Sequence, residues 1–205
     1  MTKDPYTGLY AISLKTLKLS RSALHSQEIR KVTMPYLELL WNQFPKANVN
    51  MAVFYNGEVL MLDRIDTQST PRTYFTPGRQ LPIHCTALGK VLTSELEENQ
   101  VDALLKEKGL TKYTEQTITD PVAFKKELAK VRSEGCARDR NEFIDGDNCS
   151  AVPVRGRDGK IIAGISVSAL VSNMSVEEIE RAIPRLKDTA SRISYMMGFT
   201  TTPVL

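Results

Sequence analysis

A carboxylate, a thiol and two hydroxyls fall within one stretch of the sequence, and together they could bind a small polar molecule. These groups belong to Asp139, Cys149, Ser166 and Ser168. The two serines alternate with apolar residues along an expected strand, so one face of that strand would meet a core and the other a small polar cavity. The pattern predicts ligand binding and gives little support to catalysis.

Two strands must position these side chains, and the sequence predicts them over residues 149–154 and 160–169. In the second strand, the apolar side chains that share a face are those of Ile161, Ala163, Ile165 and Val167. Asp158-Gly159 lies between the strands, and this dipeptide favours the positive φ of a two-residue hairpin turn. We therefore expect a hairpin with the candidate cavity on one of its faces.

A second candidate element is the segment LPIHCTALGKVL, residues 81–92, which changes from strand to helix. Thr86 is a candidate N-cap, which would leave the backbone N–H groups of Ala87, Leu88 and Gly89 unpaired at the positive end of the helix dipole. Such a turn can bind a carboxylate or another anion, and a glycine there lets a ligand approach closely. The alternative is a routine strand–helix turn with a packing glycine.

Catalytic and metal chemistry have few candidate residues. His25 and His84 are the only histidines. His84 and Cys85 would point to opposite faces of an expected strand, which excludes a nucleophile–base pair. Asp145 and Asp147 have the spacing of a solvated turn, and the motifs CxxC, HExxH and the Walker loop are absent. We therefore expect no enzyme activity, no metal and no cofactor.

Composition points to an ordinary soluble domain. The 205 residues are 41% hydrophobic and 25% charged, enough for one core with an attached arm. The net charge of +3 is too small to imply nucleic-acid binding by itself. No apolar run is long enough to span a membrane, and the N-terminus lacks the apolar region of a signal peptide. Three irregularly spaced cysteines predict reduced thiols in a cytoplasmic protein.

Before the candidate site, the sequence predicts two helices, a hairpin and a strand. They span residues 12–24, 26–44, 49–65 and 71–76. Pro35 should kink or split the second helix, because proline lacks an N–H group. Asn56-Gly57 in the hairpin is the strongest turn signal in the chain.

Three further helices have recognisable ends. Their start and stop signals are Ser94 with Glu97 and then Gly109, Asp120-Pro121 and then Gly135, and Ser175 with Glu178 and then Gly198. The last helix has an apolar stripe at alternating steps of three and four residues. We expect this stripe to pack against the sheet; a dimer seam is the alternative.

Three segments resemble the effector-binding domain of the IclR family of bacterial transcriptional regulators. They are LPIHCTALGKVL, SEGCARDRNEFIDGDNCSAVPVRGRDGKIIAGISVSAL and RISYMMGF. The similarity extends over residues 4–199. It implies an α+β fold that is GAF-like, a curved antiparallel sheet flanked by helices, with an N-terminal linker helix.

The resemblance also implies a function and a site. Family members form homodimers or tetramers and bind a small organic effector, often a carboxylate, that modulates DNA binding. The positions that match the family's ligand contacts are Thr73, Ala87, Leu88, Gly89, Asp139, Cys149, Ser166 and Ser168. All of them except Thr73 are also candidates from the residue pattern itself. The implied organisation is a wing-strand end and linker helix over 1–25, the effector-binding domain over 26–199, and a tail over 200–205.

The sequence departs from the family in two places. The family carries an N-terminal winged helix-turn-helix, whereas DPYTGLYAISLKTLKL resembles the end of the wing and the linker helix. Operator DNA would therefore be bound only through a domain absent from this chain. This chain would then be a fragment, a truncated gene product or a natural stand-alone sensor. In the candidate pocket loop, Arg140-Asn141 and Asp147-Asn148 replace the usual charge pattern. Arg140 would favour an anionic ligand or form a surface ion pair.

Two other functions remain open. A stand-alone GAF-type redox enzyme would use Cys85 and Cys149 as nucleophile and resolving thiol. A binding module without catalysis would act on partner proteins through the linker helix. The leading hypothesis is a sensor that binds a small metabolite, oligomerises and makes no membrane contact.

Overall fold

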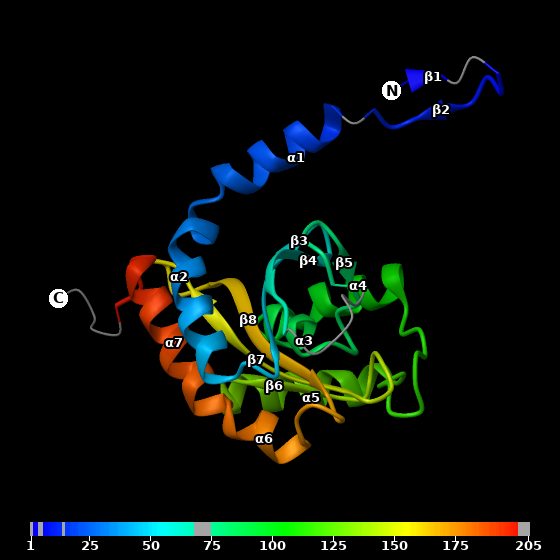
Figure 1. The fold of residues 1–205 in the computed structure, drawn as a ribbon. Helices are drawn as coiled ribbons and strands as arrows, with labels where there is room; N and C mark the ends of the chain where they lie inside the picture. The colour runs from blue at the N-terminus through cyan, green and yellow to red at the C-terminus, as the bar shows by residue number, and fades with distance from the viewer. Residues whose placement is uncertain (1, 4–5, 14, 68–74, 201–205) are drawn as a thin grey trace.

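The computed structural model describes residues 2–3, 6–13, 15–67 and 75–200 (Figure 1). Thr73 and the tail over 201–205 lie outside these residues, as does most of the strand expected over 71–76. Within the described residues, the chain forms a mixed α and β domain with an extended N-terminal arm.

One antiparallel sheet of six strands is the centre of the domain, in the order β5-β4-β3-β8-β7-β6. Its strands are β3 (Asn48–Tyr55), β4 (Glu58–Ile65), β5 (Gln80–Leu81), β6 (Ala137–Arg140), β7 (Asp147–Arg155) and β8 (Ile161–Leu170). The sheet curls into a half-barrel, so the α+β fold with a curved antiparallel sheet is confirmed.

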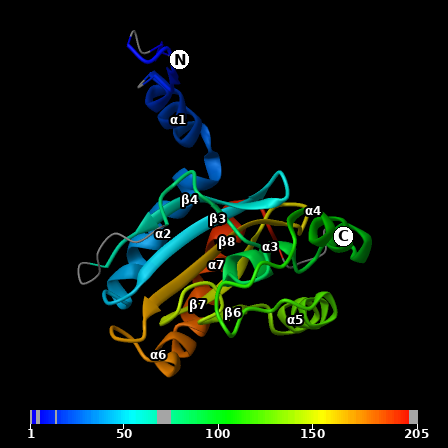
Figure 2. The same cartoon turned by 90° about the vertical axis from the view of Figure 1, so that its right-hand side faces the viewer.

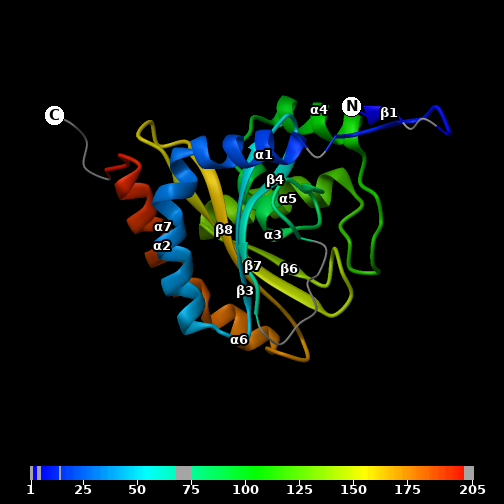
Figure 3. The same ribbon diagram turned by 45° about the horizontal axis from the view of Figure 1, so that its top comes forward.

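Helices cover both faces of the sheet, and each face has its own hydrophobic core (Figure 3). One face packs against α2 (Glu28–Gln43) and α7 (Ile183–Met196). The other packs against α3 (Ala87–Thr93), with α4 (Glu98–Lys108) and α5 (Pro121–Glu134) around it. The apolar stripe of the last helix is therefore core, as expected.

The two expected hairpins have different outcomes. Asn56 and Gly57 have φ values of 51° and 78° between paired Tyr55 and Glu58, so the first hairpin has the predicted two-residue turn. The expected two-residue turn at Asp158-Gly159 is wrong. Only Gly159 has a positive φ, and the connection runs over 156–160, closed by the Gly156 N–H donating to the Lys160 carbonyl. A register shift at the end of β7 accompanies this longer loop.

Some expected helix boundaries are also wrong. The last helix is split into α6 (Val176–Arg181) and α7, because Pro184 starts a new first turn. Helix α4 begins after Glu97, whose N–H bonds Gln100, and the expected cap at Ser94 instead bonds a carbonyl of α3.

Pro35 does not split the helix that contains it, although a split was one expectation. Helix α2 continues through Pro35 without a break. The segment around His84 and Cys85 is a bend between β5 and α3, where a strand was expected.

The N-terminal arm projects away from the domain (Figures 1 and 2). It consists of β1 (Thr2–Lys3) paired with β2 (Tyr10–Ala11), followed by α1 (Lys15–Ser26). Apolar side chains such as those of Leu17 and Leu19 are exposed along α1. Among the described residues, none of the helices has the length and hydropathy of a membrane span.

Candidate ligand-binding site

A small cavity lies between the sheet and the first turn of α3. The described residues that line it are Asn50, Met61, Phe75, Leu81, Thr86, Ala87, Leu88, Asp139, Asp147, Cys149, Ser166 and Ser168. Its volume is about 20 Å³, room for about one water molecule. Polar groups therefore converge on a nearly filled space.

Strand register explains why residues distant in the sequence meet here. Asp139 on β6 pairs with Cys149 on β7, and Cys149 pairs with Ser168 on β8. Residues directly opposite one another in an antiparallel sheet have side chains on the same face. Ser166, two residues before Ser168, lies on that face too and pairs with Asn50 of β3. The sheet thus places a carboxyl, a thiol and two hydroxyls in adjacent positions.

The first turn of α3 forms the facing wall. Thr86 caps the helix, as expected, by accepting a hydrogen bond from the Gly89 N–H at 3.1 Å. Ala87 and Leu88 line the cavity, but Gly89 does not, and its N–H is already paired. A Cβ on Gly89 would lie 2.4 Å from the Ile83 carbonyl oxygen, so this glycine is needed for close backbone packing. The packing alternative holds for Gly89.

Asn50 lines the polar side of the cavity and Arg64 lies behind it, and the residue pattern made neither of them a candidate. Asn50 Nδ2 donates to Ser166 Oγ at 3.1 Å and to Ser168 Oγ at 3.2 Å. Arg64 Nη1 donates to Asn50 Oδ1 at 3.2 Å. The available signal was an asparagine inside an apolar strand, since a buried amide needs partners.

The cavity also has an apolar side that sequence reasoning missed. Met61, Leu81 and Phe75 supply it. The Phe75 ring packs edge-on against Phe143, with the two ring centroids 6.0 Å apart, and the Arg64 guanidinium lies 5.2 Å from the Phe75 ring centroid. An apolar wall opposite polar groups is typical of sites for small organic molecules.

Two carboxyls, that of the buried Asp139 and that of the partly buried Asp147, determine the charge of the cavity. Burial is the main cause that raises the pKa of Asp139 to about 8, and the nearby Glu142 and Asp147 raise it further against the opposing hydrogen bond from the Glu142 N–H. Burial also raises the pKa of Asp147 to about 6, with Arg64 opposing. At neutral pH the cavity therefore carries less negative charge than two aspartates would suggest.

The thiols do not have the properties of redox nucleophiles. Cys85 and Cys149 are both buried and free, and burial raises the pKa of each thiol. A reactive cysteine needs a lowered pKa, so this environment opposes the redox alternative. His84 Nε2 lies 3.0 Å from the Thr111 carbonyl oxygen, and burial lowers the pKa of its imidazole.

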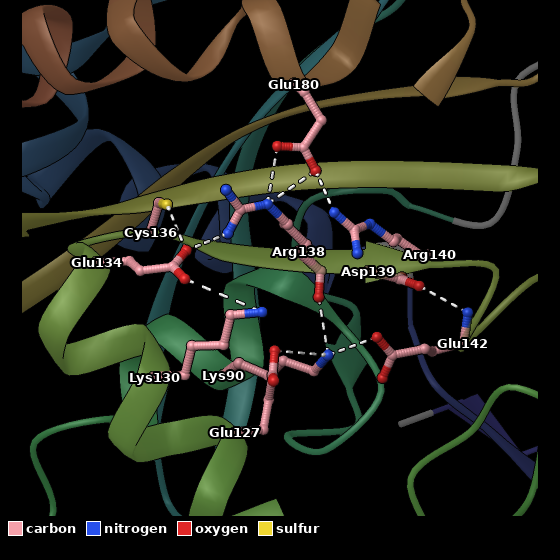
Figure 4. Close-up of polar contacts among 10 residues, drawn as sticks. All are labelled: Lys90, Glu127, Lys130, Glu134, Cys136, Arg138, Asp139, Arg140, Glu142 and Glu180. Atoms are coloured by element: carbon pink, nitrogen blue, oxygen red, sulfur yellow. Dashed lines mark hydrogen bonds and ion pairs between the residues drawn. The ribbon is translucent and has the colours of Figure 1, made fainter. Parts of the chain in front are cut away.

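A buried lysine links α3 to β6 and to the loop that follows it (Figure 4). Lys90 of α3 is 1% exposed and donates to Glu142 Oε1 at 2.5 Å and to the Arg138 carbonyl oxygen at 2.8 Å. The Glu142 N–H in turn donates to Asp139 Oδ1 at 2.8 Å. Lys90 therefore holds the segment 138–142, which carries Asp139, at both of its ends.

Arg140 lies on the outer side of β6. Its Nη2 donates to Glu180 of α6 at 2.6 Å, and its side chain is about half exposed (Figure 4). Of the two expectations for Arg140, the surface ion pair is the one the structure contains. No cluster of His, Cys, Asp and Glu suited to a metal occurs in the described part of the chain.

Comparisons with known proteins agree with this architecture. Residues 21–195 match the family described as "Bacterial transcriptional regulator IclR C-terminal". The HTH-type transcriptional regulator KdgR of Escherichia coli K12 is 31% identical over 195 residues, which cover 95% of this chain and 73% of that protein.

Solved structures are similar over most of the chain. The crystal structure of Thermotoga maritima IclR has a TM-score of 0.83 at 25% identity and covers 96% of this chain and 79% of that one. The inducer-binding domain of Acinetobacter PobR, a double mutant in complex with 3-hydroxybenzoic acid, has a TM-score of 0.74 at 28% identity, covering 82% and 98%. The chain belongs to the IclR family, and its domain is the C-terminal regulatory domain of a bacterial transcriptional regulator.

Proposed function

We propose that this domain senses a small organic acid in the cavity and thereby modulates DNA binding by an attached winged helix-turn-helix. The observation that carries the proposal is the convergence of Asp139, Cys149, Ser166 and Ser168 on one cavity. The similar domain of PobR is described as an inducer-binding domain in complex with an aromatic carboxylic acid, which supports the same ligand class here.

The cavity offers groups suited to one end of such a ligand. The N–H groups of Ala87 and Leu88 lie in the first helical turn, where the helix supplies no acceptor for them. Hydroxyls of Ser166 and Ser168 lie across the cavity. A volume of about 20 Å³ is too small for an organic acid, so the Phe75 or Met61 side chain must move when the ligand binds.

Signalling would follow if the effector bound two arrangements of the subunits with unequal affinity. We propose a homodimer or tetramer in which the effector binds one arrangement more tightly and shifts the population toward it. The exposed arm, with Leu17 and Leu19 unburied on α1, would carry this change to the DNA-binding domain. The same proposal divides the chain into the wing-strand end and linker helix over 1–25, the effector-binding domain over 26–199 and the tail over 200–205.

A thermal-shift screen tests the ligand class. Small carboxylates, keto acids, sugar acids and aromatic acids are added in turn, and an acid at a hundred times its Kd should stabilise the chain by about 2.7 kcal/mol. The shift should disappear in Asp139→Ala and Ser166→Val. Ser166→Val should still fold, because Asn50 Nδ2 keeps Ser168 Oγ as an acceptor.

Ser150→Val is the matched control. Ser150 neighbours Cys149 on β7, so its side chain points to the opposite face of the sheet. Its hydroxyl is buried and has no hydrogen-bond partner among the residues that the structure describes. This variant should keep the full shift. A shift that survives in Asp139→Ala and Ser166→Val, or that no acid produces, contradicts the proposal.

A further inference from the structure

The proposed site contains an electrostatic conflict. A ligand carboxylate would enter a cavity lined by Asp139 and Asp147. Like charges a few ångströms apart in a buried site cannot all remain ionised without a cost in free energy. Binding of an acid therefore requires that at least one of the two side chains holds a proton.

The contacts of Asp139 single it out as the proton carrier. Its side chain is 4% exposed, and Oδ1 accepts the Glu142 N–H at 2.8 Å. Oδ2 has no hydrogen-bonding partner among the residues that the structure describes. Lys90 is close, but its ammonium group bonds Glu142 and the Arg138 carbonyl oxygen and makes no ion pair with Asp139 (Figure 4).

The other ionisable groups around Asp139 come from each element packed against it. They are Cys149 and Asp147 on β7, Glu142 in the loop after β6, Cys85 just before α3, and Lys90 in α3. Most of these groups are acidic or neutral at pH 7. The cation Lys90 is already paired with Glu142 at 2.5 Å and lies 3.6 Å from Glu127. Arg64 on β4, a second cation near the cavity, donates to Asn50 Oδ1 and lowers the pKa of Asp147. On the outer face of the strand, Arg138 and Arg140 both pair with Glu180.

We infer that Asp139 keeps its proton at neutral pH and binds a ligand carboxylate as a neutral acid, through a hydrogen bond donated from Oδ2. This inference rests on the proposed function of the site. It turns the residue that would repel an acid into a donor, and it makes ligand binding dependent on pH. The raised pKa of Asp139, about 8, agrees with it.

The direction of the pH dependence follows from this assignment. Below about pH 8 the side chain of Asp139 is neutral, so its titration leaves the affinity for a carboxylate unchanged there. Above that pH the proton is lost in the free protein, and Kd should rise by up to about tenfold per pH unit. Asp147, with a pKa of about 6, can add a separate and earlier step.

Carbon-13 NMR of the chain with carbon-13-labelled aspartate carboxyls, recorded as a function of pH, measures the protonation of Asp139 without any ligand. Asp139→Asn assigns the resonance by removing it. We expect a midpoint near 8, as the raised pKa indicates. A midpoint near 4, the ordinary value for aspartate, would overturn the inference and leave the proposed function untouched.

Titration calorimetry with 3-hydroxybenzoate, at pH values from 6 to 9.5, tests the consequence for binding. Asparagine keeps a donor at this position, so Asp139→Asn should retain the affinity and lose the pH dependence, whereas Asp139→Ala should lose the affinity. Asp145→Asn removes an exposed carboxylate of the same loop that does not line the cavity, so it is the control and should keep the step near pH 8. A flat Kd in the unmodified chain, or loss of binding in Asp139→Asn, would overturn the inference. Absence of binding by every acid of the screen at every pH would instead reject the proposed ligand class, and the NMR midpoint would still decide the protonation.

Discussion

Replacing Lys90 by methionine should lower the free energy of unfolding by roughly 3–5 kcal/mol, the usual cost of breaking a buried ion pair. The variant leaves the buried Glu142 carboxylate without its closest cation, at present 2.5 Å away. It also removes the donor to the Arg138 carbonyl oxygen. Urea unfolding measures the change. Since most domains are stable by only about 5–15 kcal/mol, this is a large part of the total.

Two further variants isolate the cause. Lys130→Met removes a half-exposed lysine that lies 3.9 Å from Glu134, and a surface pair of this kind should cost under about 1 kcal/mol. Lys90→Met combined with Glu142→Leu replaces both charges by apolar groups and should recover most of the lost stability. The loss in Lys90→Met should also shrink at acid pH, because burial already raises the pKa of Glu142 and its protonation removes the unpaired charge. Equal losses in Lys90→Met and Lys130→Met would show that the buried pair is not a stabilising anchor.

Gly89→Ala should destabilise the chain by roughly 1–3 kcal/mol and weaken ligand binding as well. The added Cβ would lie 2.4 Å from the Ile83 carbonyl oxygen and 2.6 Å from Ile83 Cα. Backbone atoms cannot rotate away, so the first turn of α3, which carries Ala87 and Leu88, must shift. Thermal and urea unfolding report the first effect, and the thermal-shift response to an acid reports the second.

Gly164→Ala is the comparison for this effect. Its Cβ would meet the end of the Leu88 side chain at 3.0 Å, and that side chain can adjust. We therefore expect a smaller loss of stability than in Gly89→Ala. A greater loss in Gly164→Ala would mean that close contact between α3 and Ile83 is not what requires a glycine at position 89.

Local patterns were sufficient to predict much of the fold. Asn56-Gly57 carries its own turn geometry, and Asp120 and Gly135 mark the ends of α5 because capping depends on adjacent residues. Pro184 shows the limit of such patterns. The apolar stripe continues past it, but its missing N–H group divides the expected helix into two.

The candidate site was predictable where one hairpin carries it. Cys149, Ser166 and Ser168 lie on adjacent strands, so alternation alone places them on one face. Asn50 was not predictable in this way, because its hydrogen bond to Ser166 spans 116 residues and depends on the pairing of β3 with β8. Arg64 contacts the residues around the cavity through its hydrogen bond to Asn50 and its position over the Phe75 ring, and neither contact can be read from a local pattern.

We propose that the ligand binds in the small cavity between α3 and the sheet. A larger groove of about 210 Å³ lies elsewhere, lined by residues that include Glu58, His84, Lys108 and Tyr113. Amide hydrogen exchange, measured with and without the acid that gives the largest thermal shift, distinguishes the two locations. Binding in the small cavity should add protection at residues 86–90, 139–149 and 166–168. Protection confined to the groove around His84 and Tyr113 would contradict it.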